Sequence, residues 1–335
     1  MGNLNFVLIG CGAIAEKHAA IISSIGSLIA VCDIDKKKAD GFAKRYNAKK
    51  YFSSQKLFQK EKEIDVAVIC TPNALHPEHV IQALKSGCHV LCEKPMAIST
   101  AKAKRMIKTA IKYKRKLFVV KQNRFNPPVA YIKELLNKNK LGKIYSFQLN
   151  CFWNRANDYY KKSNWKGIKK LDGGVLYTQF SHFIDLVYWY FGDLKPVYAR
   201  IKNIAHKKVS ALEDEGVIIF QTTSGILGGF NYTLNAYQKN MEGSLTIFAE
   251  KGTLKIGGQY LNTLEYFEVK DEVMPVLPKG NPANDYGGYK GSMGNHELVY
   301  KNLLEVITGK SKNYISGEDG IKSVEIIEKI YHAGK

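Results

Sequence analysis

The stretch FVLIGCGAIA at residues 6–15 decides the fold of the N-terminal part of this chain. Its four leading apolar residues predict a strand that is buried on both faces. Gly10 permits a tight turn after the strand, and Gly12 lets a diphosphate approach the backbone at the N-terminus of the following helix. Ala15 is small enough for that helix to pack closely on the strand. The cofactor contacts expected at this turn are Gly10, Gly12, Ala13 and Ile14.

An acidic residue stands where the second strand of such a unit would end. The apolar run 28–32 predicts this strand, and Asp33 follows it. A carboxylate about 20 residues beyond the glycine-rich turn binds the ribose hydroxyls of NAD and repels the 2′-phosphate of NADP. The lysines at 36–38 keep NADP open as an alternative. We therefore expect NAD as the cofactor.

The alternation of buried strands with amphipathic helices continues to about residue 120. Further strands are predicted at 65–70, 89–91 and 117–120, and helices at 14–25, 77–86 and 103–111. Near-continuous apolar strands that are separated by helices are typical of a parallel sheet covered on both faces. The sequence therefore predicts an α/β chain with a Rossmann domain over residues 1–120.

The remaining residues, 121–335, have the pattern of a different sheet. Apolar and polar residues alternate over 145–151 and 230–234, which is typical of strands with one polar face. Further strands are predicted at 195–204, 215–220, 244–249 and 252–256, helices at 176–191, 295–308 and 318–332, and an irregular loop at 270–292. We expect a second α/β domain with a mostly antiparallel sheet.

Charge and composition exclude several other classes of protein. Of the 335 residues, 45% are hydrophobic and 11% aromatic, which is ordinary for a globular chain with room for two domains. The net charge of +20 raises nucleic acid as a partner. Only six of the 50 cationic residues are arginine, however, and base and phosphate recognition favours the arginine fork. We expect no nucleic-acid partner.

The sequence also carries no sign of a membrane or of secretion. No apolar run is long enough to span a bilayer, and the first residues lack the basic region of a signal peptide. Phe6 stands where myristoylation would need Ser or Thr. The six cysteines form no CxxC pair and mostly lie in apolar runs. We expect a cytoplasmic protein with no disulfide framework and no metal site.

Three further polar groups lie where such folds bind ligands. The segment TPNALH at 71–76 follows a predicted strand, at the sheet edge where ligands of α/β sheets bind, although it also fits an ordinary turn. Glu93-Lys94-Pro95 follows the next strand. At that edge, nearby positive charge and burial would lower the pKa of Lys94 towards a value useful for proton transfer. The alternative is one more surface lysine.

The third group is DGGVLYTQFSHFID at 172–185. Thr178 and His182 are four residues apart and would share one face of a helix. His182 suits a general acid or base, with Asp185 orienting its imidazole. The alternative is a histidine buried in the core.

Together these motifs resemble the Gfo/Idh/MocA oxidoreductase family over nearly the whole chain. The motifs are GCGAIA at 10–15, TPNALH at 71–76, EKP at 93–95 and the GG…H…D helix at 173–185. The resemblance implies a Rossmann domain, a C-terminal α/β domain with a large open sheet, and hydride transfer between NAD(P) and a sugar-like hydroxyl. It implies Lys94 and His182 as the catalytic residues. Thr178 stands where relatives such as inositol dehydrogenases carry a catalytic aspartate.

A narrower resemblance is to bacterial UDP-N-acetylglucosaminuronate 3-dehydrogenases. It rests on QNRFNP at 122–127, CFWNR at 151–155, WKG at 165–167, LDGGVLYTQFSHFIDL at 171–186 and GGYKGSMGNH at 287–296. It implies oxidation of the C3 hydroxyl of the sugar nucleotide for lipopolysaccharide and O-antigen synthesis, with NADH recycled by 2-oxoglutarate in some members. A homo-oligomer, dimer or tetramer, is implied as well. The alternatives are a dehydrogenase of a free sugar or inositol and a non-catalytic Rossmann-type binding or regulatory module.

The expected ligand contacts follow from these motifs. Beyond the glycine-rich turn, the expected cofactor contacts are Asp33, Thr71, Asn73, His76, Glu93, Lys94, Gln122 and Trp165. The expected substrate contacts are Lys94, Asn123, Arg155, Tyr159, Lys166, Thr178, Gln179 and His182. Arg155 and the lysines at 161, 162, 166, 169 and 170 crowd one segment, where they can pair with a diphosphate or a carboxylate. A solvated loop is the alternative for several of these lysines.

Overall fold

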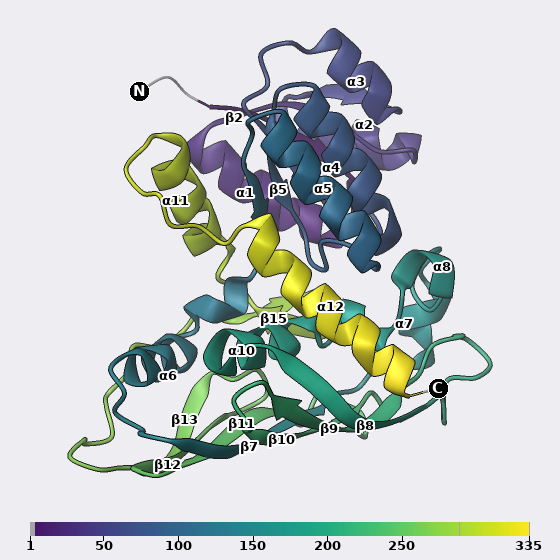
Figure 1. Cartoon of the computed structure of the whole chain (residues 1–335). Helices are drawn as coiled ribbons and strands as arrows, with labels where there is room; N and C mark the ends of the chain where they lie inside the picture. The colour runs from purple at the N-terminus through teal and green to yellow at the C-terminus, as the bar shows by residue number, and fades with distance from the viewer. Residues whose placement is uncertain (1–3, 288, 335) are drawn as a thin grey trace. The chain divides into compact units, whose positions relative to one another are not determined.

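The computed structural model describes residues 4–287 and 289–334, and the chain divides into two compact units (Figure 1). The first comprises residues 1–121 and 296–324, and the second comprises 122–295 and 325–335. From the sequence, everything after residue 120 was assigned to the second domain. In the structure, the stretch 296–324 belongs to the first unit.

The first unit contains a sheet of six parallel strands in the order β3-β2-β1-β4-β5-β6. The strands are β1 (Asn5–Ile9), β2 (Ser27–Cys32), β3 (Lys49–Tyr51), β4 (Val66–Ile69), β5 (His89–Cys92) and β6 (Leu117–Val119). The side chains of β4 are wholly buried, as their unbroken apolar run predicts. The order reverses between β1 and β4, and ligands of such sheets bind beyond the carboxyl ends at this point. The predicted Rossmann fold is confirmed.

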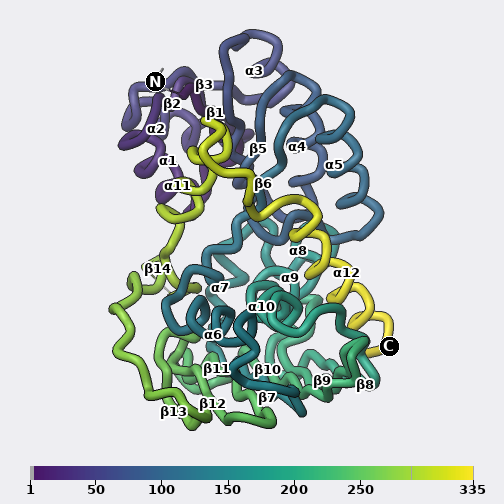
Figure 2. Tube along the Cα trace, turned by 60° about the vertical axis from the view of Figure 1, so that its left-hand side comes forward, coloured from purple at the N-terminus to yellow at the C-terminus, as the bar shows by residue number. Residues whose placement is uncertain are grey.

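The helices of the first unit are α1 (Ala13–Ile25), α2 (Lys36–Tyr46), α3 (Ser54–Lys60), α4 (His76–Lys85), α5 (Thr100–Lys112) and α11 (His296–Ile307), with a short 3-10 helix η1 (Asn73–Leu75). Helix α12 (Gly317–Ala333) begins in this unit, and its residues from 325 on belong to the second. Figure 2 shows α4 and α5 side by side. Helix α2 was not predicted because it is rich in lysine and has few apolar residues. The Asp35 side chain caps it by accepting hydrogen bonds from the N–H groups of Lys37 and Lys38.

The second unit contains a mixed sheet of seven strands in the order β13-β12-β11-β7-β10-β9-β8. The strands are β7 (Ile144–Phe152), β8 (Leu194–Lys202), β9 (Glu215–Thr222), β10 (Leu227–Thr233), β11 (Glu242–Ala249), β12 (Gly252–Gly257) and β13 (Thr263–Val269). All neighbouring pairs are antiparallel except β7 and β10, which are parallel. Burial alternates along β9, so one face of the sheet is covered and the other exposes Val217 and Ile219.

Helices α6 (Pro127–Asn137) and α10 (Ser181–Phe191) lie over one face of this sheet (Figure 1). The unit also contains the short helices α7 (Asn157–Lys161), α8 (Lys169–Asp172) and α9 (Val175–Thr178), and a 3-10 helix η2 (Gln122–Phe125). Trp153 packs against Phe180 and Phe183, and Phe147 stacks on Phe191. The predicted loop 270–292 contains part of a hairpin, β14 (Ala283–Asp285) and β15 (Lys290–Met293).

The single helix predicted at 176–191 is wrong, because the structure has two helices there. The N–H of Phe180 reaches back five residues to the carbonyl of Val175, which widens the backbone between α9 and α10. This break lets Phe180 bury its ring completely in the aromatic core. Thr178 and His182 therefore lie on different helices rather than on one helical face.

Among the described residues, no helix has both the length and the apolar character that crossing a membrane would require. All six cysteines are buried and free of disulfides. Burial raises the pKa of the Cys11 and Cys32 thiols to about 12, so both stay neutral. These two cysteines pack as small apolar side chains rather than serving as nucleophiles.

Candidate active site

The glycine-rich turn leaves open space at the N-terminus of α1. Gly10 has a φ of +95°, and a Cβ there would lie 2.7 Å from the backbone of Cys70. A Cβ on Gly12, the residue that caps α1, would meet nothing within 4 Å. Gly10 is therefore required by the protein's own packing, whereas Gly12 keeps room for a ligand. The N–H groups at the start of this 13-residue helix suit the diphosphate of a dinucleotide.

Asp33 holds the same turn from the end of β2. One carboxylate oxygen accepts a hydrogen bond from the N–H of Cys11 at 2.7 Å, and the other accepts from the N–H of Asp35 at 2.8 Å. The side chain is half-buried. Its carboxylate thus stands beside the glycine-rich turn, where a ribose hydroxyl could still donate to its remaining lone pairs. This placement fits the role expected for Asp33.

The segment after β4 contains two polar side chains with different surroundings, Thr71 and His76. Thr71 Oγ1 is buried and has no hydrogen-bond partner among the described residues, so a ligand could satisfy it. His76 has its ring nitrogens 2.7 Å from the carbonyl oxygens of Pro95 and Thr71, and burial lowers its pKa. Asn73 is buried in η1. The His76 ring therefore joins the two loops at this sheet edge, and its cofactor contact stays a prediction.

Glu93 is buried in a cluster with two histidines of the same unit. Its Oε1 lies 2.8 Å from Nε2 of His18 and 3.5 Å from Nε2 of His296, and its Oε2 accepts from the N–H of Lys94 at 3.0 Å. Burial alone would raise the pKa of Glu93, but the two histidines hold it well below its usual range. His18 is itself hydrogen-bonded to the hydroxyl of Tyr300 at 2.9 Å.

This cluster gives Glu93 a structural role. Its carboxylate binds the two histidines and anchors the backbone of Lys94, while its cofactor contact stays a prediction. Lys94 is half-buried just beyond the end of β5, as the sequence predicted. The sequence reasoning missed His18 and His296, because they lie far from Glu93 along the chain.

In the second unit, η2 carries buried polar atoms without partners. The amide nitrogen of Gln122 lies 3.2 Å from Nε2 of His182. Gln122 Oε1, both amide atoms of Asn123 and Ser181 Oγ have no hydrogen-bond partner among the described residues. Unpaired buried polar groups are costly, so these atoms mark a place where a ligand would complete the hydrogen bonding. Asp185 forms a bidentate ion pair with Arg124.

Arg155 is a buried cation that is surrounded by neutral acceptors. Only 2% of the residue is exposed, and burial lowers its pKa. Its guanidinium donates to Gln179 Oε1 at 2.7 and 3.1 Å, to Asn240 Oδ1 at 3.1 Å and to the carbonyl oxygens of Asn154 at 2.6 Å and Lys290 at 3.4 Å. Within the described part of the chain, no carboxylate pairs with it. The Arg155 guanidinium therefore has no direct contact with a carboxylate of the described residues.

A second cation lies on the same aromatic rings. The guanidinium of Arg155 lies 5.4 Å from the ring centre of Tyr159 and 5.0 Å from that of Tyr289. Nζ of Lys166 lies 4.0 and 4.6 Å from the same two ring centres and 2.9 Å from the Tyr289 hydroxyl. Lys166 is half-buried, and so is Trp165 beside it. Because both cations contact the same rings, their fields add in this part of the unit.

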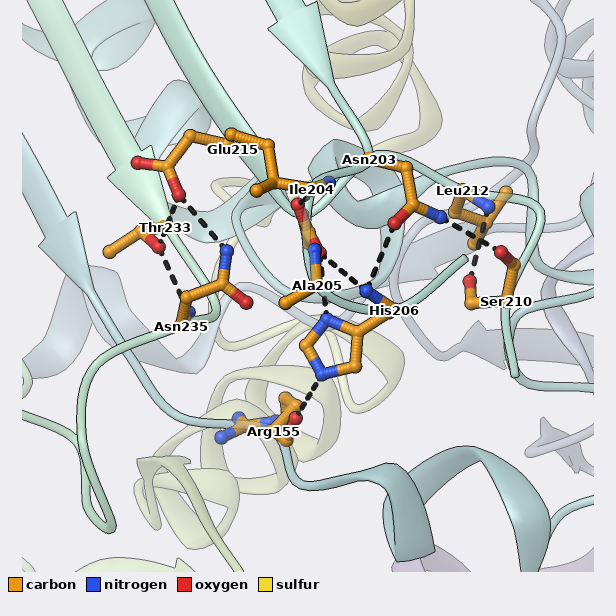
Figure 3. Close-up of polar contacts among 11 residues, drawn as sticks. Arg155, Asn203, Ile204, Ala205, His206, Ser210, Leu212, Glu215, Thr233 and Asn235 are labelled. Atoms are coloured by element: carbon orange, nitrogen blue, oxygen red, sulfur yellow. Dashed lines mark hydrogen bonds and ion pairs between the residues drawn. The ribbon is translucent and has the colours of Figure 1, made fainter. Parts of the chain in front are cut away.

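The backbone of Arg155 is bound by the ring of His206 (Figure 3). Nε2 of His206 lies 2.7 Å from the carbonyl oxygen of Arg155, and Nδ1 lies 2.8 Å from Oδ2 of Asp214. Asp214 also accepts hydrogen bonds from the N–H groups of residues 204–206. This loop fixes Arg155 before any ligand binds, and sequence reasoning had no signal for His206 or Asp214.

The expected site residues thus form two separate groups. The first unit brings together the glycine-rich turn with Asp33, and the segments after β4 and β5. The second unit brings Gln122 against His182, and Arg155 against Gln179, Tyr159 and, through the shared rings, Lys166. Thr178 adds a hydroxyl that donates to the buried carboxylate of Asp172.

Comparison with known proteins identifies oxidoreductases along most of the chain. Residues 4–121 match the oxidoreductase family with an NAD-binding Rossmann fold, and residues 129–255 match the GFO/IDH/MocA C-terminal domain. The chain is 33% identical to the WlbA dehydrogenase from Chromobacterium violaceum, solved with NADH and UDP-GlcNAcA. That match covers 100% of this chain and 94% of the other, with a TM-score of 0.89.

Two more relatives span nearly the whole chain. The WlbA dehydrogenase from Bordetella pertussis, also solved with NADH and UDP-GlcNAcA, is 30% identical over 99% of this chain and 96% of its own, with a TM-score of 0.90. Glucose-6-phosphate 3-dehydrogenase from Bacillus subtilis is 26% identical over 97% of this chain and 94% of its own. The relatives differ in the sugar that their names specify.

Proposed function

The chain belongs to the Gfo/Idh/MocA oxidoreductase family, and from that premise we propose that it oxidises the C3 hydroxyl of a UDP-N-acetylhexosaminuronate to the 3-keto sugar with NAD. UDP-N-acetylglucosaminuronate is the substrate we favour. The family and the NAD-binding domain place the protein among NAD-dependent dehydrogenases of sugar-like substrates. The proposal adds the sugar nucleotide and the carbon that is oxidised.

The observation that carries the proposal is the charge of Arg155 and Lys166. A UDP-sugar acid brings a diphosphate and a carboxylate, and either group can serve as a counter-ion for Arg155, whose contacts with described residues are all to neutral acceptors. Lys166 is the more exposed cation and is our candidate for direct contact with an acid group, while the buried Arg155 contributes its field. A neutral inositol or free sugar would bring no counter-ion to Arg155. Both WlbA structures, at 33% and 30% identity, contain UDP-GlcNAcA.

The reaction requires a hydride acceptor and a base. NAD, when bound, accepts the hydride that leaves C3 of the sugar. The hydroxyl proton passes to Lys94, which the Glu93 anchor holds in place through its backbone N–H. His182 shares in handling this proton, and Gln122 restrains the imidazole through a 3.2 Å contact. The products are the 3-keto sugar, NADH and a proton.

We further propose that the protein is a homo-oligomer that works in surface-polysaccharide synthesis. The open face of the seven-stranded sheet exposes large apolar side chains, which a second copy would cover. They include Tyr145, Tyr198, Val217, Ile219, Leu227 and Phe248. A 3-keto sugar nucleotide is a substrate for transamination, and 2-oxoglutarate is our candidate for reoxidising NADH.

The test is a comparison of kcat/KM among four substrates by NADH absorbance. They are UDP-N-acetylglucosaminuronate, UDP-N-acetylglucosamine (in which a hydroxymethyl group replaces the carboxylate), glucose 6-phosphate and myo-inositol. We expect the sugar acid to exceed UDP-N-acetylglucosamine by about 10- to 100-fold, the range for a hydrogen bond to a charged group. Faster oxidation of inositol or glucose 6-phosphate would overturn the substrate assignment.

A pair of lysine variants tests the cationic cluster. Lys166→Met keeps much of the packing volume but removes the charge, so it should lower kcat/KM for the sugar acid by about tenfold and reduce the preference over UDP-N-acetylglucosamine. Lys270→Met removes the charge of an exposed lysine just after β13 and is the control. An equal effect of the two variants would remove Lys166 from the substrate site.

A further inference from the structure

The buried cluster of His18, Glu93 and His296 brings three potential metal ligands together in the first unit. One ligand atom from each side chain lies within 4.8 Å of the other two. Glu93 Oε1 is the shared neighbour, 2.8 Å from Nε2 of His18 and 3.5 Å from Nε2 of His296. All three residues are buried, and the two histidines are at most 1% exposed. The ligands come from three separate segments, which are α1, the loop after β5 and the first residue of α11.

The ring of His296 has bonding capacity that the described residues do not use. Neither Nδ1 nor Nε2 has a hydrogen-bond partner among them, and both atoms are shielded from solvent. Nε2 nevertheless lies within ion-pair distance of Glu93 Oε1, so the ring is directed at the cluster. A buried polar group without a hydrogen bond is costly. A ligand bound within the cluster would give the Nε2 lone pair a partner.

The donor set is one that Zn²⁺ prefers. Two imidazole nitrogens and one carboxylate oxygen bind Zn²⁺ in proteins with bonds of about 2.0–2.1 Å, so neighbouring ligands of a tetrahedral ion lie about 3.3–3.4 Å apart. The pair at 2.8 Å would open by about 0.5 Å, and the widest separation, which is at most 4.8 Å, would close by about 1.5 Å at most. Small side-chain rotations achieve such changes, and a water molecule would take the fourth position.

The far side of two of these ligands is already held by the protein. Nδ1 of His18 lies 2.9 Å from the hydroxyl of Tyr300, and Oε2 of Glu93 accepts from the N–H of Lys94 at 3.0 Å. These contacts leave Nε2 of His18 and Oε1 of Glu93 directed at the cluster. Partners of this kind orient metal-binding side chains and select the histidine tautomer.

We propose that His18, Glu93 and His296 bind a Zn²⁺ ion that joins three distant segments of the first unit. The ion takes the place of the proton between His18 and Glu93, and that proton leaves to solvent. The inference goes beyond the proposed reaction and is tested without substrate. The sequence predicted no metal site, because the three ligands are far apart in the chain and form no motif. The competing explanation is a hydrogen-bonded pair of His18 and Glu93 with His296 packed beside it.

The probe is Zn²⁺ alone, added at neutral pH to tag-free protein that has been dialysed against EDTA. Isothermal titration should show one site with a Kd of about 1 µM or tighter. Anomalous scattering at the zinc edge, from crystals of the loaded protein, should place the ion among the three side chains. No uptake at about 100 µM Zn²⁺, or an anomalous peak elsewhere without one at the cluster, would overturn the proposal.

A pair of histidine variants tests the ligand set. His296→Gln removes one metal ligand but keeps a polar side chain that can still donate to Glu93. Because changing even an outer partner of a metal ligand costs about 10- to 100-fold in affinity, this variant should bind Zn²⁺ at least about 100-fold more weakly. His332→Gln is the control, because it changes an exposed histidine of α12, and its Kd should stay within about threefold of wild type. Equal affinity of His296→Gln and wild type would contradict the proposal.

Thermal melts provide a second readout of the same site. Zn²⁺ at about 100 times its Kd should raise the melting temperature of wild type by about 5–11 °C, because the ion binds the folded state. His296→Gln should show no such rise. A rise of equal size in both proteins would show that Zn²⁺ acts elsewhere. If His296→Gln does not fold, the titration and the anomalous peak of wild type decide the question.

Discussion

Replacing Glu93 by Gln removes one buried charge and almost no volume, so it isolates the anchor beneath Lys94. The carboxylate accepts hydrogen bonds from Nε2 of His18 at 2.8 Å and from the N–H of Lys94 at 3.0 Å. Hydrogen bonds to a charged group contribute about 1.5–3 kcal/mol each, against about 1 kcal/mol for a neutral one. A glutamine oxygen can keep one of the two at neutral strength. Two bonds to a charge are replaced by one neutral bond, so the expected loss is about 2–5 kcal/mol of unfolding free energy.

The loss should appear as a lower melting temperature that depends on pH. A change of 1 kcal/mol shifts the midpoint by about 2–4 °C in a domain of this size, so Glu93→Gln should melt roughly 4–20 °C below wild type near neutral pH. The pKa of Glu93 is depressed in the folded state, below its ordinary value of 4.5. Its stabilisation is therefore fully present above about pH 5 and is lost as the pH falls towards the folded pKa.

Thermal melts by circular dichroism between about pH 3 and pH 8 measure this difference. Glu63→Gln is the matched control, because Glu63 is exposed. The gap between wild type and Glu93→Gln should be constant above about pH 5 and should shrink in acid. Equal melting of the two proteins, or a gap that widens on acidification, would refute the cluster as the anchor of Lys94.

Three further predictions concern the cofactor turn, the base and a second buried acid. Gly12→Val should fold normally but bind NADH at least tenfold more weakly in a fluorescence titration, because its side chain fills open space. Gly10→Ala should lower the melting temperature, because its Cβ would lie 2.7 Å from the backbone of Cys70. Lys94→Ala should lower kcat by about 100-fold or more while NADH titration is unchanged; near-normal turnover would exclude Lys94 as the base. Burial raises the pKa of Glu213 to about 7. Wild type should therefore lose stability as pH rises from about 4.5 through 7, and Glu213→Gln should not show this part of the loss in thermal melts.

The Rossmann half could be predicted from sequence because its signals are local. Each signal lies within a few residues: the apolar strand at 6–9, the turn with Gly10 and Gly12, and Asp33. Together they indicate the sheet edge at which the cofactor is expected. Helix α2 was missed because a cap, Asp35, helps to form it where apolar spacing is weak. The break between α9 and α10 was missed because burial of Phe180 in the core overrides helical periodicity.

The sequence indicates candidate site residues in local motifs, but it does not indicate the residues that hold them in place. Lys94, His182 and Arg155 lie in recognisable motifs. His18 and His296 meet Glu93 from segments distant in the sequence, and no local pattern indicates such pairing. The same holds for His206 behind Arg155. Asp172 lies in a recognisable motif, but its hydrogen bond to Thr178 depends on the turn that joins α8 to α9.

The most direct test of the proposed reaction follows the hydrogen at C3. The enzyme is incubated with NAD and UDP-N-acetylglucosaminuronate that carries deuterium at C3, and the products are analysed by mass spectrometry. We predict deuterated NADH and a sugar nucleotide that has lost the C3 label and the hydroxyl proton, as a 3-keto product requires. Unlabelled NADH, or a sugar product that still carries deuterium at C3, would contradict oxidation at that carbon.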